Sequence, residues 1–218
     1  MLPSMSDNIL YVNEIFDSIE GEGKRAGELA TFIRLTGCNL RCSYCDTAYA
    51  FKEGTPMTVQ EILDKVHYPN VTLTGGEPLM QDIRALLEAL RSHNVNIETN
   101  GSLNIQNYFD LDNVFFTVDF KCGTSGMTKE MLPHNFKHLR KRDVLKFVVG
   151  SEEDLQQAKA LYLFHYDNLR NRQVYVSPVF EKIEPAEIVE FMKKEHLRKW
   201  RVQLQLHKFI WDPMKRGV

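Results

Sequence analysis

The sequence predicts an α/β fold, namely a partial (β/α) barrel of about six βα units. Short runs of β-branched and aromatic residues alternate with segments whose apolar residues recur at helical spacing. This alternation is typical of parallel strands joined by helices. The chain has 218 residues. That length suits one domain over residues 1–218 and allows fewer than the eight units of a closed barrel.

The strand pattern recurs along most of the chain. Strands are predicted, in order, at 29–35, 71–74, 95–99, 114–119, 144–149, 173–176 and 202–206. In folds of this kind the chemistry lies at the C-terminal ends of the strands. Unusual residues follow the strands there, among them Thr74, Asp119 and Lys121. These positions are therefore candidates for a functional site.

Helical spacing of apolar residues appears between the strands. It predicts helices at 58–66, 78–93, 151–163 and 185–196. Thr58 and Glu61 have the spacing of a capping box at the start of the first helix. Pro185 opens the last one, where the missing N–H of proline has no intrahelical partner to lose.

Composition and charge exclude several classes of protein. The chain is 43% hydrophobic and 26% charged, with a formal net charge of −2. It can bury a core, and no basic field indicates nucleic-acid binding. No apolar run approaches the roughly 20 residues that cross a membrane. Residues 1–8 lack the pattern of a signal peptide. We therefore expect a cytoplasmic protein with neither a nucleic acid nor a membrane as its partner.

Three of the four cysteines are crowded together. Cys38, Cys42 and Cys45 have the spacing C-x3-C-x2-C, and Cys122 stands apart. Three thiolates can hold three irons of a [4Fe–4S] cubane and leave the fourth iron open to another molecule. Structural zinc sites and ferredoxin clusters normally use four protein ligands. The pattern predicts a cluster with an open iron. The alternatives are ordinary buried cysteines, or a zinc site that Cys122 or a histidine completes.

The cysteine spacing resembles the signature of the radical S-adenosylmethionine (SAM) superfamily. Two further features extend the likeness: Tyr44 precedes the last cysteine, and Gly75-Gly76-Glu77-Pro78 follows the second predicted strand. Glycines let a main chain approach a ligand closely, although the same residues could form a plain turn. The resemblance implies that the fold is a radical SAM core. It also implies SAM contacts at Tyr44, Cys45, Asp46, Gly76, Glu77, Asp119, Lys121 and Ser177.

A narrower resemblance covers roughly residues 15–211. It rests on residues 16–23 (FDSIEGEG), 32–35 (FIRL), 37–42 (GCNLRC), 45–47 (CDT), 74–78 (TGGEP), 98–101 (ETNG), 119–121 (DFK) and 205–211 (QLHKFIW). These segments are similar to the 7-carboxy-7-deazaguanine synthase family, within the radical SAM superfamily. The likeness is strongest over residues 16–47.

This resemblance implies a ring contraction in queuosine and 7-deazapurine biosynthesis. The substrate would be 6-carboxy-5,6,7,8-tetrahydropterin and the product 7-carboxy-7-deazaguanine. The loss of ammonia would make the enzyme a carbon–nitrogen lyase. The implied cofactors are a [4Fe–4S] cluster on Cys38, Cys42 and Cys45, SAM used catalytically, and Mg²⁺. A flavodoxin or ferredoxin reductant and a homodimer are also expected. The cluster and SAM would carry the chemistry, so no catalytic side chain is assigned.

The substrate-binding residues follow from the same resemblance. Arg34 can grip a carboxylate through paired hydrogen bonds, although a surface ion pair is the alternative. Thr47 would be the protein ligand of Mg²⁺, unless its hydroxyl caps a helix. An N-terminal strand or loop over residues 8–27 would form part of the substrate site. The remaining expected contacts are Ile19, Glu20, Gly21, Glu22, Thr74 and His207.

Three residues carry open alternatives. Family members commonly have glutamine where this chain has Glu20, and a carboxylate only accepts hydrogen bonds. It remains compatible with the N–H donors of a pterin. His207 is expected at the end of the last strand, facing the substrate, although a core histidine is the alternative. Asp119 and Lys121 could form an ordinary ion pair, and Cys122 is expected to be a structural thiol.

Other functions remain open from the sequence. A radical SAM activating enzyme, which generates a glycyl radical on a partner protein, shares the cysteine motif and the glycine-rich turn. An electron-carrying iron–sulfur module would bind the cluster without cleaving SAM. A zinc-binding scaffold would contain no labile sulfide.

Overall fold

The computed structural model describes residues 8–218, so most of the segment 1–8, assessed above for a signal peptide, lies outside the described residues. One sheet holds all nine strands of the described chain. These are β1 (Ile9–Ile19), β2 (Leu29–Leu35), β3 (Thr55–Thr58), β4 (Asn70–Gly75), β5 (Asn94–Thr99), β6 (Val114–Lys121), β7 (Val144–Val149), β8 (Gln173–Pro178) and β9 (Trp200–Val202). Their order in the sheet is β3-β1-β2-β4-β5-β6-β7-β8-β9.

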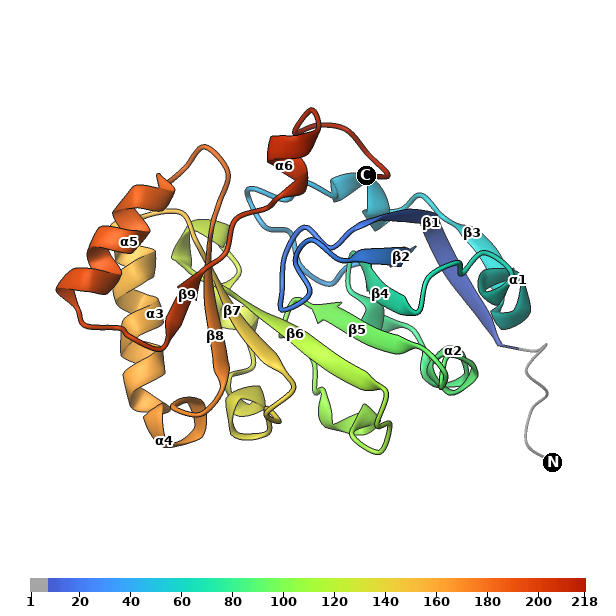
Figure 1. Cartoon of the computed structure of the whole chain (residues 1–218), viewed down its shortest axis with the longest axis horizontal. Helices are drawn as coiled ribbons and strands as arrows, with labels where there is room; N and C mark the ends of the chain where they lie inside the picture. The colour runs from blue at the N-terminus through green and yellow to red at the C-terminus, as the bar shows by residue number, and fades with distance from the viewer. Residues whose placement is uncertain (1–7) are drawn as a thin grey trace.

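Seven neighbouring strands of the sheet run parallel, namely β2, β4, β5, β6, β7, β8 and β9. At one edge, β1 pairs antiparallel with both β2 and β3. The two outermost strands of residues 8–218, β3 and β9, do not pair with each other, so the sheet stays open. The prediction of an α/β partial barrel is confirmed. Figure 1 shows the curved sheet, with β9 at one end and β3 at the other.

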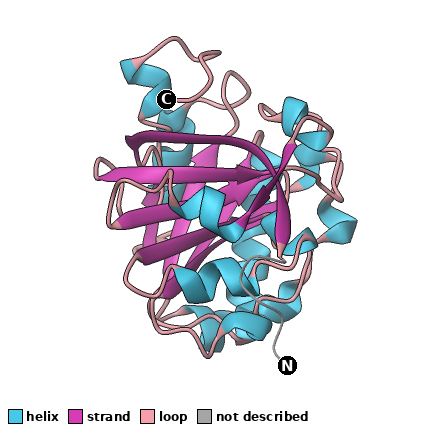
Figure 2. Cartoon of the chain, turned by 90° about the vertical axis from the view of Figure 1, so that its right-hand side faces the viewer, coloured by secondary structure: helices cyan, strands magenta, loops and turns pink. Residues whose placement is uncertain are grey.

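The helices are α1 (Val59–Leu63), α2 (Arg84–Ala89), α3 (Glu152–Phe164), α4 (Tyr166–Leu169), α5 (Pro185–Lys194) and α6 (His207–Ile210). Helices α1 to α5 cover the outer side of the sheet, whereas α6 lies apart from them, beyond the strand ends (Figures 1 and 2). The predicted capping box is present, because Thr58 and Glu61 exchange side-chain and backbone hydrogen bonds at the start of α1. No helix within residues 8–218 combines the length and the apolar composition that crossing a membrane requires.

Two predicted elements are wrong in their extent. The segment 78–93 divides into a 3-10 turn, Pro78–Met80, and the helix α2. Gln81 is extended between them, and its side-chain amide bonds the backbone of Tyr11 and Thr36. These long-range hydrogen bonds interrupt the helical pattern.

The last strand is β9, not the predicted 202–206. After Val202 the chain leaves the sheet, and Leu206 N donates to Gly21 O at 3.0 Å. His207 therefore begins α6 instead of ending a strand. Sequence reasoning also missed β3, and it gave β1 only as an N-terminal strand or loop within residues 8–27, without its bounds. Polar residues interrupt the apolar pattern of β1, and the short edge strand β3 contains Pro56.

The two faces of the sheet differ in chemistry. Strand residues that point to the helices are apolar and fully buried, as Leu73, Ile97 and Phe147 illustrate. Alternate residues point to the other face. The pairings Arg34 with Thr74, Glu98 with Thr117, and Asp119 with Lys146 align polar side chains across neighbouring strands of that face. The inner face is therefore a polar surface on an apolar core.

Candidate active site

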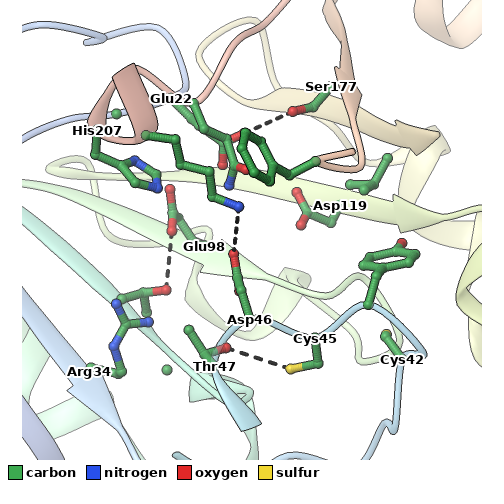
Figure 3. A pocket seen from close by; sticks show the side chains of 18 of the residues that line it. Glu22, Arg34, Cys42, Cys45, Asp46, Thr47, Glu98, Asp119, Ser177 and His207 are labelled. Carbon is green, nitrogen blue, oxygen red and sulfur yellow. Dashed lines mark hydrogen bonds and ion pairs between the residues drawn. The ribbon is translucent and has the colours of Figure 1, made fainter. Parts of the chain in front are cut away.

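A cavity of about 670 Å³ lies over the inner face, at the C-terminal ends of the parallel strands. Its wall includes Arg34 from β2, Thr74 from β4, Glu98 from β5, Asp119 from β6 and Ser177 from β8. Figure 3 shows Glu22 and His207 on one side of this space and Cys45 and Thr47 on another. The location agrees with the rule that open α/β sheets bind ligands beyond their strand ends.

The loop after β2 brings three thiols to the cavity. Cys38, Cys42 and Cys45 are partly exposed, unpaired in any disulfide, and part of its wall. Burial raises the pKa of Cys38 and of Cys42, and iron binding would displace those protons. Three sulfur donors on one loop fit an iron–sulfur cluster. Within residues 8–218 these thiols do not gather as ligands of a single metal ion.

Cys122 lies elsewhere. Its side chain is fully buried in the apolar core and does not line the cavity. Burial raises the pKa of this thiol, which keeps it protonated. The position agrees with a structural thiol.

The glycine turn after β4 packs directly on the cysteine loop. Gly76 N donates to Leu35 O at 3.1 Å, and Glu77 N donates to Gly37 O at 2.7 Å. A Cβ atom on Gly76 would lie 2.1 Å from Gly37 O and 2.8 Å from Cys38 Cβ. Only glycine fits at this contact, and Gly75 and Gly76 both line the cavity.

Gly76→Ala is expected to weaken SAM binding by about tenfold or more, because the added methyl group forces the turn away from the cysteine loop. Equilibrium binding of SAM to the reconstituted protein measures this. Gly123→Ala is the control, since Gly123 lies outside the cavity wall, its φ is not positive, and a Cβ there would lie 3.1 Å from its nearest neighbour, Asp154 Oδ1. Unchanged SAM affinity in Gly76→Ala would contradict the prediction.

Glu77 has its side chain away from the cavity. The carboxylate is fully buried and accepts hydrogen bonds from Asn100 N at 2.7 Å and Thr99 Oγ1 at 2.8 Å. Burial raises the pKa of Glu77 to about 7, despite the opposing effect of these donors. The side chain ties the glycine turn to the end of β5. It does not line the cavity in which SAM contacts were predicted.

A charged network forms the floor of the cavity. Lys146 Nζ lies 2.9 Å from Glu22 Oε2 and 3.1 Å from Asp119 Oδ1. Lys121 Nζ lies 2.6 Å from the other oxygen of Asp119, and the Ser177 hydroxyl donates to Glu22 at 2.9 Å. The predicted Asp119–Lys121 ion pair thus exists, and both residues also line the cavity. Residues from four separate segments meet at this point.

The charges on this floor stabilise one another. Burial alone would lower the pKa of Lys146, but Asp119, Glu22 and Glu98 raise it well above its ordinary value. Burial opposes the charge of Asp119, yet Lys121 and Lys146 lower its pKa overall. Both groups are therefore ionised at neutral pH. Burial raises the pKa of Glu98 to about 7, although Lys146 opposes the shift.

Arg34 and Thr47 occupy another side of the cavity. Arg34 Nε donates to Glu14 Oε1 at 2.7 Å, so the predicted alternative of an ion pair is also present. The guanidinium nevertheless lines the cavity. Thr47 precedes a 3-10 turn, but its hydroxyl makes no capping hydrogen bond and lies 3.7 Å from Cys45 Sγ.

The end of β1 and the residues that follow it contribute three of the four residues predicted there. Ile19, Gly21 and Glu22 line the cavity, whereas Glu20 does not. The buried Glu20 carboxylate instead bonds Arg25 and the Thr72 hydroxyl. The Glu20 carboxylate is thus engaged by protein groups outside the cavity wall, and the predicted substrate contact at Glu20 stays a prediction. Arg25, in the loop that follows, forms an ion pair with this carboxylate, which the sequence analysis assigned to the substrate.

His207 closes the cavity from above. A Cβ on Gly21 would lie 2.2 Å from His207 Nδ1, so the imidazole packs directly on that glycine. Burial lowers the pKa of His207, which favours the neutral ring. Beside it, Lys208 Nζ lies 3.5 Å from Asp46 Oδ2, and both residues line the cavity. The start of α6 thus contacts both the N-terminal segment and the cysteine loop.

The comparisons with known proteins agree with this geometry. A model of the Radical SAM superfamily matches residues 32–141. A 7-carboxy-7-deazaguanine synthase from Clostridium acetobutylicum is 45% identical, over 95% of this chain and 98% of the relative. The chain belongs to the 7-carboxy-7-deazaguanine synthase family. A family member from Chlorobaculum tepidum is 40% identical, over 96% of this chain and 97% of its own length.

The fold matches a solved structure of the family as well. The crystal structure of QueE from Escherichia coli superposes with a TM-score of 0.72, covering 90% of this chain and 94% of that one at 23% identity. That likeness concerns the fold.

Sequence reasoning missed two charged residues of this synthase-family cavity. Glu98 and Lys146 lie on the polar face of β5 and β7. A signal was available, because each is a charged residue within an otherwise apolar or amide-bearing parallel strand. Their shared cavity becomes apparent only with the register of the sheet.

Proposed function

We propose that this protein converts 6-carboxy-5,6,7,8-tetrahydropterin to 7-carboxy-7-deazaguanine with loss of ammonia, as a radical SAM carbon–nitrogen lyase of 7-deazapurine and queuosine biosynthesis. One observation carries the proposal: a single cavity joins three partly exposed cysteines, a glycine turn and a wall of polar side chains. Membership of the synthase family supports the same reaction.

Two cofactors have fitting surroundings in this cavity. Cys38, Cys42 and Cys45 would hold the [4Fe–4S] cluster, with SAM between the cluster and the ends of β4, β6 and β8. With the cluster reduced and SAM bound to it, the two cofactors would supply a radical that abstracts a hydrogen atom. The Tyr44 hydroxyl is buried without a hydrogen-bond partner in residues 8–218, so a bound group beside the cysteine loop would satisfy it. Gly76, Asp46, Asp119, Lys121 and Ser177 complete the proposed SAM site.

The substrate would bind the part of the cavity nearer to β1 and α6. Arg34 has terminal nitrogens suited to the pterin carboxylate, and Thr47 offers a hydroxyl to Mg²⁺. Glu22 and Glu98 accept hydrogen bonds, which suits the amino and ring N–H donors of a pterin. Thr74, Ile19, Gly21 and His207 add the remaining contacts. Segment 8–27 thus forms one wall of the proposed substrate site.

The wider setting of the reaction is also proposed. We infer a single-domain cytoplasmic enzyme that requires Mg²⁺, forms a homodimer and receives electrons from a flavodoxin or ferredoxin. The length and sequence pattern support the single domain and the location, and the resemblance to the family supports the other parts. Each can be tested separately. Metal removal is the simplest test: chelation should lower turnover, and added Mg²⁺ should restore it.

An anaerobic assay tests the function directly. The reconstituted and reduced protein, with SAM, Mg²⁺ and the carboxytetrahydropterin, is expected to form 7-carboxy-7-deazaguanine with SAM largely unconsumed, as mass spectrometry would detect. Release of 5′-deoxyadenosine with an intact pterin would refute the substrate. Absence of SAM cleavage by a protein with a full cluster would refute the enzymatic role. Turnover without any partner protein would argue against a glycyl-radical activating enzyme.

A further inference from the structure

We propose that Glu14 is a positioning residue that orients the guanidinium of Arg34 for the carboxylate of the substrate. The inference rests on the proposed function, in which Arg34 binds that carboxylate. Glu14 does not line the cavity, whereas Arg34 does. Glu14 therefore contacts Arg34 from the side of the arginine that faces away from the cavity.

The fold places these two residues directly opposite each other. Glu14 on β1 pairs with Arg34 on β2, after a register irregularity between Val12 and Glu14. Such irregularities re-aim a side chain and are common beside active sites. Side chains directly opposite each other on an antiparallel pair share one face of the sheet. The irregularity thus sets the glutamate beside the arginine on the inner face.

The hydrogen bond uses the one donor that leaves the end of the arginine free. Glu14 Oε1 accepts from Arg34 Nε at 2.7 Å. The terminal nitrogens Nη1 and Nη2 donate to no protein atom among the described residues 8–218. A guanidinium carries five N–H donors in a fixed plane, so one bond at Nε fixes the plane and leaves four donors. Those four remain for a ligand in the cavity.

Glu14 is itself held in place. The Tyr49 hydroxyl donates to the same Oε1 atom at 2.9 Å, and the Arg216 guanidinium covers the Tyr49 ring at 3.7 Å. Two donors on one oxygen restrict the carboxylate, which in turn restricts Arg34. Fixing a flexible side chain before the ligand arrives reduces the entropy lost on binding.

Charge and orientation predict opposite effects for this glutamate. A carboxylate beside an anion-binding arginine repels the ligand, so charge alone predicts tighter binding once Glu14 is removed. Orientation predicts weaker binding, confined to ligands that carry a carboxylate. The sign of the change therefore separates the two roles.

Calorimetric titration of the reconstituted, unreduced holoenzyme with SAM and Mg²⁺ tests the proposal. The two ligands are 6-carboxypterin and pterin, which lacks the carboxylate. Glu14→Leu is expected to lose about tenfold in affinity for 6-carboxypterin, with the pterin affinity unchanged within about twofold. Glu14→Gln keeps an acceptor for Nε and should stay within about threefold of wild type for both ligands.

A control on the same strand is available. Asp17→Leu also removes a β1 carboxylate that bonds a β2 residue, Thr31, but neither Thr31 nor His67, the other partner of Asp17, lines the cavity as Arg34 does. Its affinities should match those of wild type. Tighter or unchanged binding of 6-carboxypterin by Glu14→Leu would overturn the proposal, as would an equal loss for both ligands. If the wild type does not prefer 6-carboxypterin, or Arg34→Met keeps the preference, the proposed function fails instead.

Discussion

Cys42→Ala is expected to abolish SAM cleavage. Cys42 lies between the other two thiols of the cavity loop, and its removal leaves one iron of a cubane without a protein ligand. The reconstituted variant should contain less iron and sulfide than wild type and lose the electron paramagnetic resonance signal of the reduced cluster. Release of 5′-deoxyadenosine, measured without the pterin so that SAM is not regenerated, should fall to background.

Cys122→Ala provides the matched control for this experiment. The side chain is fully buried outside the cavity, so only the core should change. We expect a normal iron content and normal SAM cleavage, with a melting temperature lower by a few degrees because a small void remains. Equal loss of the cluster in both variants, or SAM cleavage by Cys42→Ala, would refute the assignment of the three ligands.

Lys146→Met is expected to destabilise the protein strongly. The ammonium group contacts two carboxylates, Glu22 and Asp119, on the enclosed floor of the cavity. Breaking a buried ion pair from one side costs about 3–5 kcal/mol, and the partial exposure of both partners reduces this to about 3 kcal/mol. The melting temperature should fall by roughly 6–12 °C.

Charge pairs elsewhere supply the control for Lys146. Lys193→Met removes a lysine that pairs with Glu190 on the exposed face of α5, with 66% and 69% of their side chains exposed. Its effect should stay within about 0.5 kcal/mol. The raised pKa of Lys146 keeps its contribution complete below about pH 10 and removes it only above that value. The difference from wild type should therefore persist from about pH 6 to about pH 9. Similar melting temperatures for both variants would contradict the role of Lys146.

The features predicted correctly from the sequence are mostly local ones. The cysteine spacing, the capping box at Thr58 and most parallel strands depend on residues near one another in the chain. Glu98 and Lys146 were missed because their shared face depends on the pairing of distant strands. The pairing of Glu20 with Arg25 could not be predicted because Arg25 folds back to meet it, and the helix over 78–93 was too long because Gln81 bonds distant backbone.

The loop between β1 and β2 also bears on how the chain folds. Gly23 N donates to Gln203 Oε1, 180 positions away in sequence, and Ser177 donates to Glu22 from 155 positions away. Contacts between such distant segments form slowly, because long loops must close first. During synthesis, the loop between β1 and β2 cannot complete its contacts in the cavity wall until residue 203 has left the ribosome. The pocket is thus among the last regions to assemble, and ligand binding reports that the whole chain has folded.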